Sequence, residues 1–311
     1  MALNITFRQL RVFAEVVKLG SVQRAADALH LTPPAVSMQI KELEHQVGLS
    51  LFDRGNRRLV LSTAGEYFLV YARRLLGTLK EAEDAMARFT RIESGTLNVG
   101  MVSSAKYFLP QLLAQFHTEH PGIEVRLRLG SREQLAALMQ ANEIDLAIMG
   151  RPPKDFACRA EPFAMHPHVL VTAPTHPFAQ AESVPAAALA REPFIVREPG
   201  SGTRAALDEY LDSHHLMPMV VMEMHSTEAI KQAVMAGLGV SLISLHTIGL
   251  EWRMGLIAAP AVEGLPLMRR WHVVNTAAKL LSPAAEALRY FILERGEAHL
   301  AAMYADTPLQ G

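Results

Sequence analysis

The stretch AADALHLTPPAVSMQIKELE, residues 25–44, constrains the fold more than any other segment, because it places two adjacent prolines between two helix-forming segments. Thr32 can act as a helix N-cap, and Pro33 and Pro34 then fall in the first helical turn, where a missing amide hydrogen costs little. We therefore predict that one helix ends near Leu29, that residues 30–32 form a tight turn, and that a new helix begins at Pro33.

The segments around this turn complete a three-helix unit. Residues 7–19 place apolar side chains at helical spacing and are followed by Gly20, and Ser21 is a good N-cap for a second helix over residues 22–29. The third helix is expected to run to about residue 47, with an apolar face formed by Val36, Ile40, Leu43 and Val47. Two helices joined by a tight turn and packed on a first helix form a helix-turn-helix.

Residues 51–61 predict a wing next to this unit. Two short strands, residues 51–52 and 59–61, flank a turn that carries Arg54, Arg57 and Arg58. Residues 1–62 contain eight Lys and Arg but five Asp and Glu, although the whole chain has a formal net charge of −1. Any attraction to nucleic acid must therefore come from this local positive patch.

Residues 63–92 contain no proline and predict one long helix. Its apolar side chains recur every three or four residues and form a narrow seam between charged residues. A narrow seam on a long helix indicates a partner helix, which we expect from a second copy of the chain.

Strands and helices alternate from residue 94 onward, which predicts an α/β region with a mostly parallel sheet. The expected strands include TLNVGMV, IEVRLRLG, DLAIMG and HVLVTAP, and the expected helices include FLPQLLAQFHTEH and SPAAEALRYFILERG.

Composition argues against several classes of protein. The single cysteine, Cys158, can form neither an internal disulfide nor a cysteine metal site, which is typical of a reducing compartment. No apolar run reaches the ~20 residues that span a bilayer, and the N-terminus lacks the apolar core of a signal peptide. We expect a cytoplasmic protein that does not enter a membrane.

Motifs for catalysis or metal binding are weak. The histidine pairs 117/120, 166/168 and 214/215 lack a carboxylate spaced to complete a metal site. The segment PGSGTRAA fits a dinucleotide pattern, but its strand does not open a βαβ unit, and the second glycine of a nucleophile elbow is absent. We expect no catalytic residue, no metal and no cofactor.

The N-terminal run FRQLRVFAEVVKLGSVQRAADALHLTPPAVSMQIKELEHQVGLSLFDR, followed by STAGE and the long helix, resembles the LysR-type transcriptional regulators. The resemblance extends over essentially the whole chain. It implies an N-terminal all-α winged helix-turn-helix, a long dimerising linker helix, and an α/β effector domain of two subdomains, like a periplasmic binding protein.

This resemblance sets the expected boundaries. The DNA-binding domain covers residues 1–62, the linker helix 63–92, and the effector-binding domain 93–305. Within the effector-binding domain, subdomain I covers about 93–162 and 268–305, and subdomain II about 163–267.

The C-terminal stretches SSAKYFLP, IDLAIMGRPP, HPHVLV, REPGSGTR, EAIKQAVMAG, SLISLHT and WHVV look closer still to one subgroup, the CbbR-type regulators of Calvin-cycle carbon dioxide fixation operons. This similarity implies a homodimer or homotetramer that binds double-stranded promoter DNA, senses a small metabolite, acts on RNA polymerase, and usually activates its operon.

The third helix is expected to lie in the major groove of DNA. Its candidates to face bases are Pro33, Pro34, Ser37 and Met38, and Thr32 and Lys41 are expected to touch phosphate. The wing residues Arg54, Arg57 and Arg58 can reach the backbone or the minor groove. The family usually has Thr-Gln-Pro-Ala-Val-Ser here, so this chain has proline in place of a glutamine that can read a base edge.

Polar and cationic residues follow the expected strands, and ligands of open α/β sheets bind beyond the carboxyl ends of strands. The resulting effector candidates are Ser103, Ser104, Lys106, Ser131, Arg132, Met149, Gly150, Arg151, Gly202, Thr203, Arg204, Ser226 and Thr227. This set suits an anionic effector, with a phosphorylated sugar, phosphoenolpyruvate, ATP and NADPH as candidates, although simple N-capping explains the serines and threonines equally well.

Three alternatives stay open. The chain could be a LysR-type regulator of a different metabolic operon, a constitutive architectural DNA binder, or an enzyme fused to a DNA-binding module. The last would need an acid–base pair or nucleophile in its cleft, which the sequence does not supply.

Overall fold

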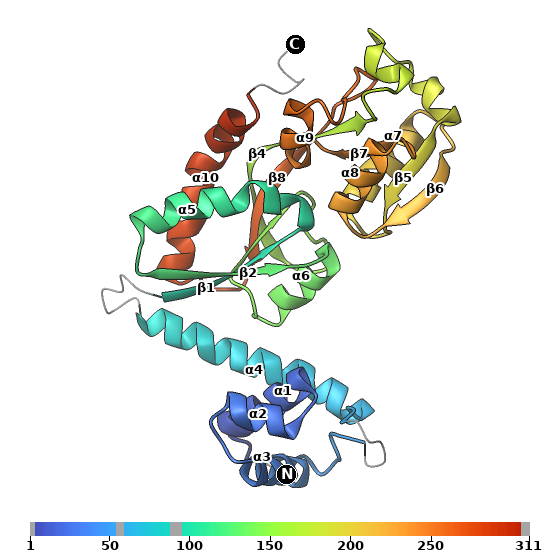
Figure 1. Ribbon diagram of the computed structural model, residues 1–311. Helices are drawn as coiled ribbons and strands as arrows, with labels where there is room; N and C mark the ends of the chain where they lie inside the picture. The colour runs from blue at the N-terminus through green and yellow to red at the C-terminus, as the bar shows by residue number, and fades with distance from the viewer. Residues whose placement is uncertain (1–3, 54–58, 88–94, 306–311) are drawn as a thin grey trace. The chain divides into compact units, whose positions relative to one another are not determined.

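The computed structural model describes residues 4–53, 59–87 and 95–305, which form two compact units (Figure 1). One unit consists of the helices α1 to α4, and the other begins with strand β1 and ends with helix α10. Each unit has its own hydrophobic core.

The first unit contains the predicted helix-turn-helix. Its helices are α1 (Phe7–Leu19), α2 (Val22–Ala28), α3 (Pro33–Val47) and α4 (Thr63–Ala87). The predicted caps form: the Ser21 hydroxyl accepts from the Arg24 amide, and the Thr32 hydroxyl accepts from the Ala35 amide. Gly20 and Gly48 end α1 and α3 in the left-handed conformation, which glycine adopts without a steric penalty.

The wing is shorter than predicted. Its two flanks meet in a single antiparallel bridge, Phe52 to Leu61, in place of two strands, and residues 54–58 lie outside the described part of the chain. The Glu44 carboxylate accepts hydrogen bonds from the amides of Leu51, at 2.7 Å, and Phe52, at 3.3 Å. These bonds anchor the start of the wing to α3.

Helix α4 begins with a close contact to this wing. A Cβ at Gly65 would lie 2.0 Å from the carbonyl oxygen of Leu51, so only glycine fits there. Farther along α4, large apolar side chains are exposed, namely Tyr67, Val70, Tyr71 and Leu75. Of these four, Tyr71 and Leu75 belong to the predicted apolar seam, and the predicted end of the helix, residues 88–92, falls outside the described chain.

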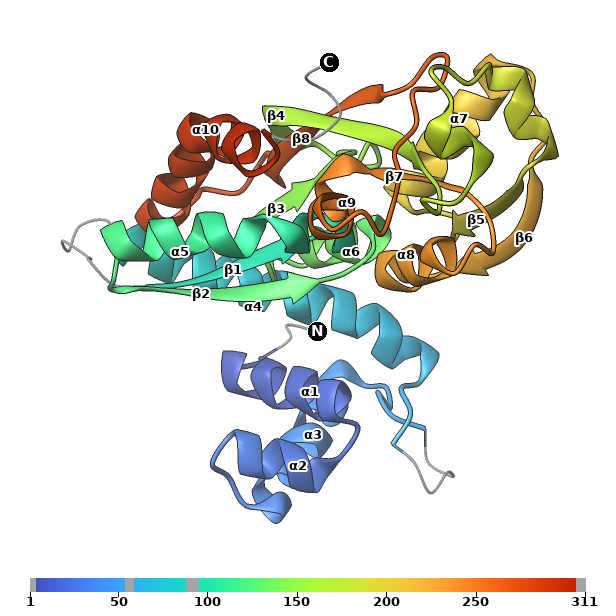
Figure 2. The ribbon, with the colours of Figure 1, turned by 45° about the horizontal axis from the view of Figure 1, so that its top comes forward.

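The second unit is built on a six-stranded sheet with the order β2-β1-β3-β8-β4-β7. The strands are β1 (Gly95–Met101), β2 (Ile123–Leu129), β3 (Leu146–Met149), β4 (Cys158–Val171), β7 (Ser241–Ser244) and β8 (Leu267–Thr276). Helices α5 (Leu109–Glu119) and α10 (Pro283–Met303) cover one face, and α6 (Arg132–Gln140) packs on the other (Figures 1 and 2).

The sheet is mixed, so the expectation of a mostly parallel sheet is wrong here. β1 pairs parallel with β2 and β3, whereas β3 with β8, β8 with β4, and β4 with β7 pair antiparallel. The sequence predicts only the end of β4, because Pro162 and Pro167 disfavour a strand. The structure accommodates Pro162 at a bulge, where the register with β8 shifts between Pro162 and Ala164.

β4 and β8 run through two lobes, each with its own apolar clusters. Lobe I holds α5, α6, α10 and the sheet around β1. Lobe II holds β5 (Pro193–Arg197), which pairs parallel with β6 (Met219–Met224), together with α7 (Gly202–Ser213), α8 (Thr227–Met235) and β7. The predicted subdomain boundaries stay a prediction.

Short helices complete the second unit. They are the 3-10 helices η1 (Ser103–Tyr107), η2 (Pro177–Gln180), η3 (Ala186–Arg191) and η4 (Leu245–Thr247), and α9 (Gly249–Arg253). Across the described ranges, the structure contains no helix that combines the length and the apolar character needed to cross a bilayer.

Candidate DNA-binding surface and effector pocket

Helix α3 has two distinct faces. Val36, Ile40 and Leu43 are buried against the other helices. Pro34, Met38 and Lys41 are all exposed, and they are spaced by four and three residues, so they share the outer face. Met38 is 59% exposed, which is high for a large apolar side chain. An outward apolar and cationic surface of this kind can contact base methyl groups and phosphates.

The remaining DNA-binding candidates lie near the same surface or outside the described chain. Thr32 is exposed, and its oxygen already accepts from the Ala35 amide at 3.4 Å, which leaves its hydroxyl hydrogen to donate. Pro33 and Ser37 are half-buried in the first turns of α3. Arg54, Arg57 and Arg58 belong to the residues that the structure does not describe.

A cavity of about 500 Å³ lies in the second unit, lined by residues from both lobes. Most of the effector candidates meet there. They are Ser103, Ser104, Ser131, Arg132, Met149, Gly150, Arg151, Gly202 and Thr203. Strand ends from distant parts of the sequence therefore do converge on one cavity.

Four effector candidates lie outside the lining. The Lys106 ammonium lies over the ring of Tyr107, at 5.0 Å from its centroid. The Arg204 guanidinium pairs with carboxylates of α7 and β6. Ser226 caps α8, and the Thr227 hydroxyl accepts a hydrogen bond from Arg197, which is itself a lining residue.

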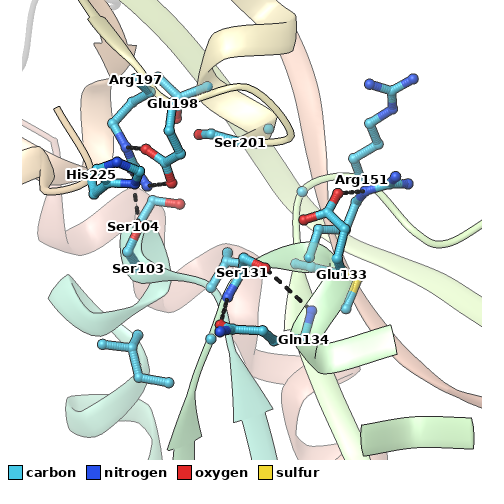
Figure 3. Close-up of a pocket in the computed structure, with 18 of the residues that line it drawn as sticks. Ser103, Ser104, Ser131, Glu133, Gln134, Arg151, Arg197, Glu198, Ser201 and His225 are labelled. Atoms are coloured by element: carbon cyan, nitrogen blue, oxygen red, sulfur yellow. Dashed lines mark hydrogen bonds and ion pairs between the residues drawn. The ribbon is translucent and has the colours of Figure 1, made fainter. Parts of the chain in front are cut away.

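Arg197 and Glu198 form the main ion pair of the pocket, and sequence analysis missed both (Figure 3). Arg197 Nε and Nη2 each donate to a Glu198 carboxylate oxygen, at 2.7 Å. Its Nη1 donates to Ser103 of lobe I at 3.2 Å, and so joins the lobes. Burial alone raises the pKa of Glu198, but the bonds from Arg197 outweigh it and hold this pKa below its usual value.

Helix starts also face the cavity. Ser131 caps α6, with its hydroxyl accepting from the Gln134 amide at 3.2 Å, and the Gln134 side chain accepts from the Ser131 amide at 2.8 Å (Figure 3). α7 begins at Gly202 after Ser201, whose side chain makes no capping bond. Amides at the start of α7 are therefore available to an anion.

The lining carries an excess of positive charge. Four arginines line the cavity, Arg132, Arg151, Arg197 and Arg269, against two glutamates, Glu133 and Glu198. His166 and His168 also line it, and burial lowers the pKa of both, so they add no charge near neutral pH. This electrostatic balance favours a negatively charged ligand.

Arg197 is the last residue of the buried strand β5, directly before the loop into α7. It therefore follows the same pattern as the predicted effector residues, which are polar or cationic side chains at the ends of strands. His166 and His168 gave no such signal, because they lie inside β4 and reach the cavity only through the pairing of that strand with β8.

A winged helix-turn-helix followed by a two-lobed α/β unit with a ligand-sized cavity defines a DNA-binding regulator with a sensory domain. Residues 7–66 match the family "Bacterial regulatory helix-turn-helix protein, lysR family", and residues 91–297 match "LysR substrate binding domain". The chain belongs to the LysR family of bacterial transcriptional regulators, which confirms the predicted family and fold class.

Its relatives include regulators named for carbon fixation genes. The chain is 47% identical to the HTH-type transcriptional regulator CfxR of Cupriavidus necator, over 93% of this chain and 92% of that protein. It is 41% identical to the RuBisCO operon transcriptional regulator of Allochromatium vinosum, over 94% and 96% of the two chains.

Solved structures show the same fold. The regulatory domain of Synechocystis CcmR, in complex with 2-PG, superposes with a TM-score of 0.63 and 37% identity, covering 65% of this chain and 97% of that one. Full-length CbnR complexed with its target DNA has a TM-score of 0.69 at 21% identity, covering 93% and 99%.

Proposed function

We propose that this regulator controls a carbon dioxide fixation operon, which it activates in response to a small anionic metabolite. The cavity carries the proposal, because it combines an excess of arginine with the free helix start of α7. The names of the relatives support the choice of operon, and the CcmR complex supports a small ligand in the second unit.

The Arg197–Glu198 pair gives a physical route to sensing. An anion that enters the cavity competes with the Glu198 carboxylate for the Arg197 guanidinium. Arg197 also holds Ser103 of the opposite lobe, so a change at Arg197 alters a bond that joins the lobes. The effector can shift the equilibrium between two arrangements of the lobes only to the extent that it binds one arrangement more tightly than the other.

The output is DNA binding by an oligomer. The outer face of α3 supplies one reading surface for each copy, and the exposed stripe of α4 supplies a surface for a partner copy. A dimer of dimers would place several α3 helices along the promoter and bend it, and the effector would change this bend and the access of RNA polymerase.

Two measurements test the proposal. Purified protein is titrated onto the promoter region of a RuBisCO operon in the presence and absence of ribulose bisphosphate, phosphoenolpyruvate, ATP, NADPH and 2-PG. The melting temperature is recorded with the same ligands, since a ligand that binds only the folded state stabilises by about 2.7 kcal/mol at a hundredfold excess over its Kd. We expect at least one ligand to raise the melting temperature and to change the footprint.

A double variant, Arg197→Gln with Glu198→Gln, removes both charges of the pair together and should abolish the response. Arg159→Gln is the matched control, because Arg159 is exposed and does not line the cavity. Stabilisation by an aromatic acid and by none of the anions would instead assign the protein to another operon. Equal binding to the promoter and to unrelated DNA of the same length would contradict sequence-specific regulation.

A further inference from the structure

Tyr107 of lobe I contacts Glu228 of lobe II at a place outside the cavity lining. The Tyr107 hydroxyl, at the end of η1, donates a hydrogen bond to a Glu228 carboxylate oxygen in the first turn of α8. η1 is fixed to lobe I, because Ala105 and the adjacent Phe108 are fully buried in the core of that lobe. α8 is fixed to lobe II through Ile230, which is buried with residues of β5 and β7. The Tyr107–Glu228 hydrogen bond therefore joins the two lobes.

The protonation states of the two groups make this a charge-assisted hydrogen bond. Burial raises the pKa of the Tyr107 hydroxyl well above its usual value, and the Glu228 carboxylate raises it further. Burial alone would raise the pKa of Glu228, but the bonds from Tyr107 and Lys231 hold this pKa below its usual value. At neutral pH the tyrosine is therefore protonated and the glutamate is charged. A hydrogen bond to a charged acceptor is stronger than one between neutral groups.

Lobe II balances the charges of this site without Tyr107. The Lys231 ammonium is buried, and it lies 2.9 Å from a Glu228 oxygen and 2.7 Å from a Glu251 oxygen. It also donates to the Thr247 carbonyl oxygen at 3.0 Å. The Tyr107 ring, whose centroid is 4.7 Å from this ammonium, adds a cation–π contact across the lobes. Removal of the Tyr107 hydroxyl would therefore leave no buried charge of this site without a partner.

Arg197 contacts the same two elements, η1 and α8. Its Nη1 donates to Ser103 at 3.2 Å and to Thr227 at 3.0 Å. Ser103 begins η1, which ends at Tyr107, and Thr227 begins α8 directly before Glu228. A ligand that takes Arg197 away from Ser103 removes one bond between η1 and lobe II, but the Tyr107–Glu228 bond remains. This second bond must also break before η1 and α8 can move apart.

We propose that the Tyr107–Glu228 hydrogen bond sets the sensitivity of the regulator, because it stabilises the arrangement of the lobes in which Glu198 occupies Arg197. The inference rests on the proposed function, since it takes the cavity as the effector site. An effector that competes with Glu198 for Arg197 favours a different arrangement, so the free energy of the bond opposes effector binding. When the binding-competent arrangement is a minor population, the apparent Kd is raised in proportion. Tyr107 thus controls the effector concentration to which the protein responds, although it does not line the cavity.

Two tyrosine variants test this role by calorimetry with ribulose bisphosphate, phosphoenolpyruvate, ATP, NADPH and 2-PG. Tyr107→Phe keeps the ring over Lys231 and removes only the hydroxyl. We expect each anion that binds the unchanged protein to bind this variant about tenfold more tightly, as for one lost hydrogen bond to a charged group. Tyr210→Phe is the matched control, because the Tyr210 hydroxyl donates to the Glu263 carbonyl oxygen at 2.6 Å within lobe II. It should lower the melting temperature and leave the Kd unchanged.

A variant of the acceptor shows whether the hydrogen bond itself is responsible. Glu228→Gln keeps the size of the side chain and weakens the acceptor, and Lys231 keeps Glu251 as a partner. Each single variant should tighten binding, but the double variant should bind no more tightly than Tyr107→Phe, because both changes remove one interaction. Without effector, Tyr107→Phe should also show part of the promoter footprint that the effector produces in the unchanged protein.

The outcomes separate this inference from the proposed function. Unchanged or weaker binding of the anions by Tyr107→Phe, or equal effects of Tyr107→Phe and Tyr210→Phe on the Kd, would overturn the inference alone and leave the bond a purely structural role. Additive tightening in the double variant would assign the effect of Glu228 to Lys231 and would contradict the inference as well. If none of the five anions binds the unchanged protein, the proposed function fails, and this inference fails with it.

Discussion

The outer face of α3, the candidate DNA-binding surface, and the arginine-rich cavity, the candidate effector pocket, are organised in opposite ways. The α3 face comes from one continuous helix whose ends are capped by Thr32 and Gly48 and whose inner face is packed. The pocket gathers residues that lie more than 160 positions apart in the chain, from Val102 to Arg269. One surface therefore depends on a single helix, whereas the other depends on the whole fold of the second unit.

This contrast implies different responses to change. A substitution on the inner face of α3 costs folding stability, because Val36, Ile40 and Leu43 are packed there. A substitution among the charged residues that line the cavity should mainly change ligand binding, because these residues lie at its wall. Substitutions and a change of pH can distinguish these two kinds of response.

The largest effect is expected at Gly65. In Gly65→Ala the new Cβ would lie 2.0 Å from the Leu51 carbonyl oxygen, so α4 or the wing must move. We expect a loss of about 3 kcal/mol in the free energy of unfolding of the first unit, together with loss of DNA binding. Gly202→Ala is the matched control, since no atom lies within 4 Å of its Cβ position, and it should be nearly neutral. An unchanged melting profile for Gly65→Ala would show that the wing is not held by this contact.

Acid should destabilise the second unit through its buried histidines. Burial lowers the pKa of His168 and of His246 to about 3, and His246 Nδ1 accepts from Trp271 Nε1, which requires the neutral ring. Below pH 6.5 the unfolded chain binds protons that the folded protein does not bind. Stability therefore falls as the pH drops from about 6.5 toward 3.

When the pH falls from 7 to 5.5, we expect His168 and His246 each to lower the free energy of unfolding by about 1 kcal/mol. Denaturant unfolding at the two pH values measures this loss. His168→Phe should remove about half of the pH dependence of stability that His168 and His246 contribute together. A slope that is unchanged in this variant would mean that His168 is already charged in the folded protein.

Glu198→Gln should tighten the binding of anions. It keeps the size of the side chain and removes the carboxylate that occupies Arg197. We expect about tenfold tighter binding of the anionic effector, the equivalent of ~1.4 kcal/mol. Glu182→Gln changes the net charge equally at an exposed site outside the cavity and should have no effect. Weaker binding in Glu198→Gln would show that Glu198 helps to hold the ligand.

The smallest effect is expected on the α3 surface. Lys41→Ala should reduce the slope of log affinity against log salt by just under one unit, and weaken all DNA sequences alike, because a phosphate contact carries no sequence information. Lys18→Ala, on the exposed side of α1, should leave the slope unchanged. A change of base preference in Lys41→Ala would reassign this side chain to base reading.

The sequence predicts the α3 region almost completely, because caps, prolines and apolar spacing are local signals that one helix can satisfy alone. It predicts the pocket in part. Serines and arginines that follow strand ends are predicted correctly as cavity residues, because ligands of α/β sheets bind beyond the carboxyl ends of parallel strands. The sequence does not place His166 and His168 at the cavity, because their position depends on the antiparallel pairing of β4 with β8, and Pro162 disfavours a strand in the first half of β4.

The pairing of β4 with β8 also has a mechanical consequence. Both strands pass from one lobe to the other as a continuous hydrogen-bonded ribbon that extends from Cys158 and Thr276 to His168 and Leu267. A lobe that turns on flexible loops swings freely, but a lobe carried by such a ribbon can turn only by twisting it. The bulge beside Pro162 is where such twist is easiest to absorb. We therefore expect the two lobes to move relative to each other by small rotations only.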